Sequence, residues 1–180
     1  MRNNGNETFF YWEEKNIFPY IASVIDRISP YMCGEWSFKG GAINGQPANK
    51  SRRADLYCYY KELGFLIELK RYWNIIQLRG LLHQIRDLEL LHNGYIPNDN
   101  TVILGILTMA GGGGREAGVL ANYDEAYRTI INSARDIQTE INIQDLNIAV
   151  AFEEFRDAID SSDNRITWGA IFYFASTTQV

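Results

Sequence analysis

The stretch that decides the fold runs from Arg53-Ala54-Asp55-Leu56-Tyr57 to Phe65-Leu66-Ile67-Glu68-Leu69-Lys70. Apolar and aromatic residues dominate both ends of it, which predicts two short strands. Between them, Lys61-Glu62-Leu63-Gly64 predicts a turn in which Gly64 is the flexible position. Because side chains alternate along a strand, Glu68 and Lys70 should point to one face, and Ile67 and Leu69 to the other.

Asp55 and Glu68 are the first candidates for a functional site. If Asp55 points the same way as Glu68, two carboxylates and the Lys70 ammonium converge at one end of the hairpin, and hard divalent cations prefer such oxygen ligands. The alternative is a solvated polar face with a Glu68–Lys70 ion pair. The apolar run around Glu68 is typical of a central strand, where a charge is costly unless it is paired or bound to metal. The sequence therefore favours a metal site.

These residues carry a family resemblance. Asp55, followed after twelve residues by Glu68-Leu69-Lys70, resembles the bipartite motif of the PD-(D/E)XK nuclease superfamily, which includes restriction endonucleases, repair nucleases and Holliday-junction resolvases. Ala54 stands where the family name has Pro, a substitution that is common in such enzymes. The resemblance covers about residues 9 to 110 and rests on three side chains with their strand context.

The resemblance implies a role for each matching residue. It implies that Mg²⁺ or Mn²⁺ is held by Asp55, Glu68 and the backbone carbonyl of Leu69, and that Lys70 orients or helps to deprotonate the attacking water. An acidic residue from an N-terminal helix often joins such a metal site, so Glu14 is a further candidate ligand, with Glu13 as the alternative. Solvated carboxylates at a helix start, favoured by the helix dipole, are a somewhat better explanation of both.

A glutamine often follows the Glu-x-Lys strand in this family. The segment from Asn74 to His92 has the apolar spacing of an amphipathic helix. Gln84 on this helix is our candidate for an additional catalytic residue, and Gln77, seven residues earlier, is the alternative. His83 and His92 have no spacing that indicates a zinc site.

Composition describes an ordinary globular protein. The chain has 180 residues, 46% apolar and 22% charged, and we expect a single domain over residues 1–180. Its two cysteines, Cys33 and Cys58, form no disulfide framework or metal-ligand pattern. No apolar leader follows Met1, and no apolar run reaches the length of a membrane span. We therefore expect a cytoplasmic protein that is not in the membrane.

Charge is unevenly distributed along the chain. The net charge is −5, but residues 50–86 carry eight Lys or Arg against three Asp or Glu, so this segment is +5 and the rest of the chain −10. A basic segment around the candidate site is typical of local phosphate capture. The candidate nucleic-acid contacts are Lys50, Arg52, Arg53 and Arg71. For Arg79 and Arg86, an ordinary helix-surface role is nearly as good an explanation.

The remaining segments complete an α/β pattern. We expect a helix over Thr8–Ile28 with a kink or break at Pro19, a strand over Gly34–Phe38, and a loop from Gly40 to Ser51. Further elements are expected as a buried strand over 101–108, a mobile loop at Gly111–Gly114, a helix over 123–140, and strands over 148–152 and 168–174, the last at a sheet edge. This order predicts a mixed sheet flanked by helices, which matches the restriction-endonuclease-like fold of the resembled family.

The predicted function is a Mg²⁺-dependent endonuclease that hydrolyses phosphodiester bonds, with DNA as the expected partner. A homodimer is a candidate assembly because many such nucleases pair up to cut both strands, although no residue indicates one. Two alternatives stay open. The chain could be a catalytically inactive member of the same fold that binds nucleic acid or protein, or an unrelated α/β protein in which the motif is a coincidence.

Overall fold

The computed structural model describes residues 14–29, 31–38, 42–43, 46–47, 52–95, 100–112, 122–159 and 165–177. They form an α/β fold with a six-stranded mixed sheet, a separate two-stranded ladder and three described helices. The expected fold class, a mixed sheet flanked by helices, is confirmed. None of the described helices is long and apolar enough to cross a membrane.

The elements follow the chain in a simple order. The helices are α1 (Glu14–Asp26), α2 (Ile75–Tyr95) and α3 (Tyr123–Ile141). The sheet strands are β1 (Tyr31–Phe38), β4 (Arg52–Tyr60), β5 (Leu63–Arg71), β6 (Thr101–Gly112), β7 (Asn147–Ile159) and β8 (Arg165–Thr177), and the small ladder pairs β2 (Ala42–Ile43) with β3 (Gln46–Pro47).

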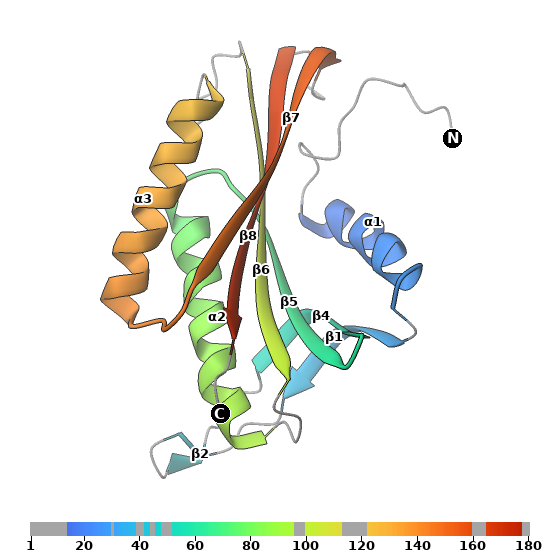
Figure 1. Cartoon of the computed structure of the whole chain (residues 1–180), viewed down its shortest axis with the longest axis vertical. Helices are drawn as coiled ribbons and strands as arrows, with labels where there is room; N and C mark the ends of the chain where they lie inside the picture. Colours follow the sequence, from blue (N-terminus) through green and yellow to red (C-terminus); the bar gives the residue numbers. More distant parts are fainter. Residues whose placement is uncertain are drawn as a thin grey trace.

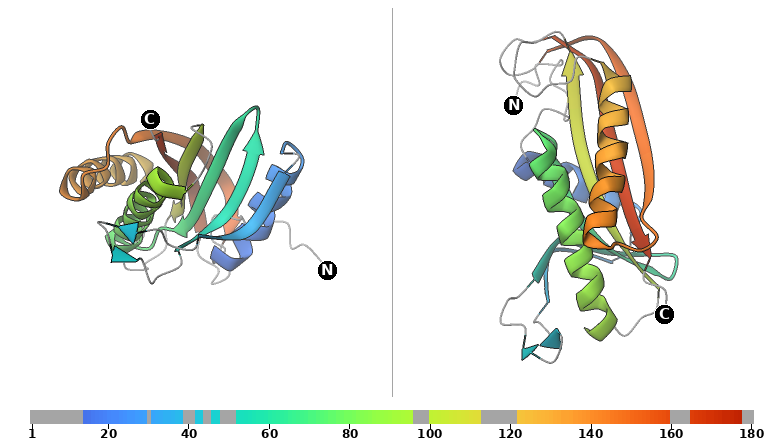
Figure 2. Two further views of the ribbon diagram at one scale, coloured as in Figure 1. Left: turned by 90° about the horizontal axis from the view of Figure 1, so that it is seen from below. Right: turned by 90° about the vertical axis from the view of Figure 1, so that its left-hand side faces the viewer.

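The sheet has the order β1-β4-β5-β6-β8-β7. The β5–β6 pair is parallel, and the other pairs of this sheet are antiparallel. Parallel neighbours need a crossover connection, and α2 supplies it. Helices α2 and α3 cover one face of the sheet while α1 lies on the other (Figures 1 and 2).

The apolar pattern of the strands builds a core on each face. Beneath α2 and α3, the buried side chains include Leu66, Leu107, Phe172 and Phe174. Beneath α1, a smaller cluster contains Leu56, Cys58, Ile67, Leu69 and Ile106. Leu66 and Ile67 thus belong to opposite cores, as the alternation of side chains along β5 predicts.

The turn of the β4–β5 hairpin differs from the prediction. Only Lys61 and Glu62 form it, and both have positive φ, at 47° and 69°. Such a two-residue turn matches the twist of the flanking strands. Gly64 lies within β5, paired with Tyr59, and a Cβ there would come within 3.3 Å of the Tyr57 hydroxyl. The glycine therefore makes room for a neighbouring side chain and is not part of the turn.

Several element boundaries also differ from the prediction. Pro19 lies inside α1, but the helix continues from Glu14 to Asp26 and is not broken in two. Proline removes one intrahelical hydrogen bond near the start of α1, while Ile17, 2% exposed, anchors the same helix against the sheet. The segment 8–13, which the prediction included in this helix, lies outside the described residues.

The end of the chain is arranged differently from the prediction as well. The edge strand is β7, and β8 is internal between β6 and β7. Its position follows from apolar residues on both faces, Phe172 and Phe174 on one and Ile171 and Tyr173 on the other. Gly111 and Gly112 belong to β6, where a bulge separates them, so the first half of the expected glycine loop is a strand. Gly113 and Gly114 lie outside the described part of the chain.

Candidate functional site

The candidate site lies where β4 and β5 separate. Their ladder runs from Tyr60↔Leu63 to Leu56↔Ile67 and stops there. Beyond this point β4 stays paired with β1 as far as Arg52, while β5 stays paired with β6 as far as Arg71. Asp55 and Glu68 occupy the first positions past the last β4–β5 pair. We call Asp55 together with Glu68–Lys70 the fork.

Where the backbone pairing of β4 with β5 ends, the Asp55 side chain supplies the next hydrogen bond between the two strands. Its Oδ2 accepts a hydrogen bond of 2.8 Å from the backbone N–H of Leu69. In an extended strand, the N–H and C=O of one residue point to the same edge. The Leu69 carbonyl is therefore directed toward β4, the side on which the Asp55 carboxylate lies. Two kinds of oxygen, carboxylate and carbonyl, come together at this edge.

Glu68 brings a second carboxylate to the fork from inside the protein. It is 2% exposed, on the face of β5 that also carries Leu66. Lys70 lies on the same face, with its Nζ 3.9 Å from Oε1 of Glu68 and 20% of its side chain exposed. At this distance the two groups form an ion pair, but they are too far apart for a direct hydrogen bond. Lys70 thus connects the buried carboxylate with the surface.

Helix α2 passes over the sheet at the level of Glu68. Glu68 is paired with Gly105 of β6, and a Cβ at Gly105 would come within 2.7 Å of Cδ1 of Ile85. Gln84 is the neighbour of Ile85, and its Oε1 is buried with no hydrogen-bond partner among the described residues. An unsatisfied buried amide oxygen is uncommon and calls for an explanation.

Gln77, the alternative to Gln84, has a structural role. Its Oε1 accepts a hydrogen bond from Asn74 N–H, and Asn74 Oδ1 accepts one from Ile76 N–H. This reciprocal arrangement caps the first turn of α2. It occupies the Gln77 oxygen, so Gln84 is the better of the two candidates for a role in the site.

The remaining predicted site residues are placed only in part. Glu14 is the first residue of α1, and Arg52 the first of β4, but their side chains lie outside what the structure describes; Lys50 lies outside it altogether. Arg53 is exposed. Arg71 is 8% exposed, and its Cζ lies 3.6 Å from the centre of the Trp73 ring. Arg71 is therefore stacked on an aromatic side chain, a contact that the sequence did not indicate.

The donors of the fork suit a hard divalent cation. Carboxylate and carbonyl oxygens are the ligands that Mg²⁺ takes, usually with several waters completing its shell. Within the described side chains, no group of three or more His, Cys, Asp or Glu could hold a metal. The fork offers oxygen donors of the kind that Mg²⁺ takes, and not the nitrogen and sulfur ligands that a softer metal such as zinc prefers.

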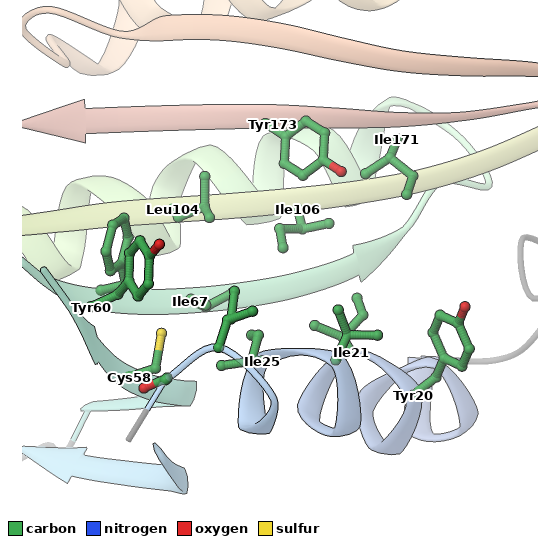
Figure 3. Close-up of a pocket in the computed structure, with 14 residues that line it drawn as sticks. Tyr20, Ile21, Ile25, Cys58, Tyr60, Ile67, Leu104, Ile106, Ile171 and Tyr173 are labelled. Carbon is green, nitrogen blue, oxygen red and sulfur yellow. The ribbon is translucent and has the colours of Figure 1, made fainter. Parts of the chain in front are cut away.

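A large pocket lies on the opposite face, between α1 and strands β4, β5, β6 and β8 (Figure 3). It has a volume of about 340 Å³ and no charged residue in its lining. The polar side chains in its lining are those of Tyr20, Ser29, Cys58, Tyr60 and Tyr173. Burial raises the pKa of Cys58 and Tyr173, so both stay protonated at neutral pH. This pocket offers no carboxylate and no cation, so it is not suited to phosphate chemistry.

Sequence reasoning missed two features of this region. The stacking of Arg71 on Trp73 was missed because Trp73 follows the strand and precedes the helix cap, where no periodicity applies. The apolar pocket was missed because it forms between α1 and distant strands. Its signal was that apolar residues lie on more than one face of α1, including Tyr20, Ile21, Val24 and Ile25. Comparison of the chain with family models, with curated proteins and with solved structures gave no match.

Proposed function

We propose that this protein is a divalent-cation-dependent nuclease with a restriction-endonuclease-like fold, cutting phosphodiester bonds in DNA. The observation that carries the proposal is the fork, in which Asp55 and the Glu68–Lys70 run meet where two strands separate. A buried carboxylate beside an ammonium is costly to maintain. Such an arrangement is a functional-site candidate when it opens to the surface, as it does here through Lys70.

The proposed metal ligands are Asp55, Glu68 and the carbonyl of Leu69. When bound there, Mg²⁺ or Mn²⁺ would polarise the phosphate and lower the pKa of a coordinated water. Asp55 is held in place by the Leu69 amide, and Glu68 is held by the packing around it, so neither needs to be ordered when a substrate arrives. Such preorganisation is what makes electrostatic stabilisation effective.

Lys70 and Gln84 have supporting roles in the proposal. The Lys70 ammonium offsets the charge that develops on the phosphate, and it can hold or pass a proton of the attacking water. The buried oxygen of Gln84 is an acceptor that can orient the same water or a neighbouring group of the site. Both roles depend on access from the surface, which the partly exposed Lys70 side chain supplies.

An inactive member of the same fold is the second candidate function. It is favoured by the described side chains, which supply two carboxylates to the fork and no third. On this alternative the fork would bind nucleic acid or a partner protein without cutting. Metal uptake without cleavage would be its signature, whereas the nuclease needs both.

Asp55→Asn and Glu68→Gln test the proposed function. Asn keeps an acceptor oxygen for the Leu69 amide, so Asp55→Asn should fold normally while it loses the charge that attracts the cation. We expect both variants to lose Mn²⁺ binding by calorimetry, and Mg²⁺-dependent cleavage of DNA to fall to the level of a metal-free reaction. Thermal unfolding checks that each variant is folded.

The matched control is Glu153→Gln, which removes an exposed carboxylate from β7 at the far edge of the sheet. It should bind Mn²⁺ and cut DNA like the wild type. If the two fork variants retained wild-type Mn²⁺ affinity, the fork would not be the metal site and the proposal would fail.

A further inference from the structure

Trp73 is an exposed aromatic residue that lies shortly after the end of β5 and stacks on Arg71. Its side chain is 46% exposed although the guanidinium of Arg71 lies 3.6 Å from the ring centre. A guanidinium at that distance covers one face of the indole. Because nearly half of the residue is nevertheless exposed, the opposite face of the ring is directed to solvent.

The backbone on both sides of Trp73 is fixed. Before it, the N–H of Tyr72 donates a hydrogen bond of 2.8 Å to the carbonyl of Thr108, which extends the pairing of β5 with β6. After it, Asn74 and Gln77 cap α2. Arg71 is itself 8% exposed and cannot swing away freely. The ring is therefore preorganised, which reduces the entropy that a ligand stacking on it would lose.

The surroundings of Trp73 point to a nucleic acid strand as its ligand. Trp73 lies three positions after Lys70, a span of at most about 10 Å along the chain. A few stacked nucleotides cover this distance at about 3.4 Å each. A strand whose phosphate lies at the fork would bring a base within reach of the indole. Ile75 and Ile76, which follow closely in the chain, are also exposed, at 41% and 69%.

We propose that Trp73, backed by Arg71, is a stacking platform for an unpaired base, and that the substrate is single-stranded or locally unpaired nucleic acid. This inference rests on the proposed function, because it assumes a phosphate in the fork. A base that is paired and stacked within a duplex has no free face for the indole, whereas an unpaired base does. Stacking accepts every base, so the platform selects strand state and not sequence.

Trp73→Ala and Trp73→Phe test the platform in the full-length protein. Binding of fluorescently labelled oligothymidine and of a duplex of the same length is measured by anisotropy at one salt concentration, with Ca²⁺ in place of Mg²⁺ to prevent cleavage. We expect Trp73→Ala to weaken single-strand binding by about tenfold, from the size of base–aromatic stacking, and duplex binding by less than twofold. Trp73→Phe should restore most of the single-strand affinity.

Tyr31→Ala is the matched control, because Tyr31 is an aromatic residue, 69% exposed, that pairs with Tyr59 near the turn end of the hairpin, away from the fork. It should leave both affinities unchanged. An equal loss on single strand and duplex in Trp73→Ala, or no loss on either, would overturn the platform.

The platform and the proposed nuclease function fail in different ways. If wild-type protein cuts DNA with Mg²⁺ but Trp73→Ala binds single strands like the wild type, the platform is wrong and the nuclease stands. If the wild type binds single strands through Trp73 but never cuts, the nuclease is wrong and the platform stands.

Discussion

Glu68 is a residue that this fold would not need for stability alone. Its side chain is 2% exposed on a face that also holds Leu66, where an apolar residue of similar size would pack without removing a charge from water. The Lys70 ammonium, at 3.9 Å, compensates only in part because it is partly solvated. Asp55, by contrast, both stabilises the backbone through the Leu69 amide and presents a carboxylate to the fork.

Lys70→Arg distinguishes a proton-handling lysine from a simple positive charge. Arginine keeps the charge, but its pKa stays above about 12, so it cannot release a proton at neutral pH. If Lys70 shares a proton with the attacking water, the variant should lose most of its cleavage activity at every pH between 6 and 9, with single-strand binding little changed. Lys61→Arg, in the exposed turn, is the control, and its cleavage activity should match that of the wild type. A pH–rate profile of Lys70→Arg that superimposes on the wild type would exclude the proton role.

At the scale of elements, the site depends on how closely α2 approaches the sheet. Leu78, Leu81, Leu82 and Ile85 of α2 are all fully buried. Gly105 permits this approach, because any side chain there would meet Ile85 and Leu81. The same contact fixes how closely the turn of α2 that carries Ile85 approaches the strand pair Glu68↔Gly105. A glycine in a central strand is therefore a condition for the geometry of the site.

Gly105→Ala tests this packing, and Gly80→Ala on α2 is the comparison. A Cβ at Gly105 would lie 2.7 Å from Cδ1 of Ile85, which cannot move away because it is fully buried. Overpacking of this kind should destabilise the protein by about 1–3 kcal/mol. A Cβ at Gly80 meets nothing within 4 Å, so Ala there should stabilise α2 by about 1 kcal/mol. Thermal or urea unfolding measures both changes, and equal effects of one sign would contradict the packing.

At the scale of the whole molecule, positive charge is concentrated in one segment of an otherwise acidic chain. Residues 50–86 are +5 in a chain of net −5, and they include both strands of the fork and most of α2. The fork therefore lies in the segment whose charge favours attraction of a polyanion, although Arg79 of that segment is paired with Glu140 and Arg86 with Glu89. The apolar pocket beneath α1 lies on the opposite face of the sheet and takes no part in this attraction.

The salt dependence of DNA binding measures how many phosphates this basic segment contacts. Each phosphate neutralised on duplex DNA contributes about −0.9 to the slope of log affinity against log salt. Replacing Arg52 and Arg53 together with Ala should weaken binding to all sequences alike and flatten the slope by about one unit per lost contact. Arg128→Ala, on the exposed side of α3, is the control and should leave the slope unchanged. If the double variant kept the wild-type slope, these arginines would be structural and the strand would enter elsewhere.

Local rules were enough to predict most elements of this fold. Period-two alternation identified β5 with its two faces, and the apolar stripe identified α2 and α3, because each element must bury one side whatever it packs against. The bipartite motif also located Asp55, Glu68 and Lys70 before their positions were known. In α2, by contrast, Ile75 fits the stripe and yet is 41% exposed, because the stripe does not reveal where the helix leaves the sheet.

Tertiary structure alone decided the features that depend on distant partners. The sequence by itself determined which residues are apolar, which carry charge and which strand follows which. It could not determine that the β4–β5 ladder ends at Leu56↔Ile67 and leaves the Leu69 amide for Asp55, because that depends on β4 following β1 and β5 following β6. It could not place β8 inside the sheet, or Arg71 under Trp73, for the same reason. Which strands pair depends on how much apolar surface the whole sheet buries on its two faces. That total cannot be read from the residue pattern of any single strand.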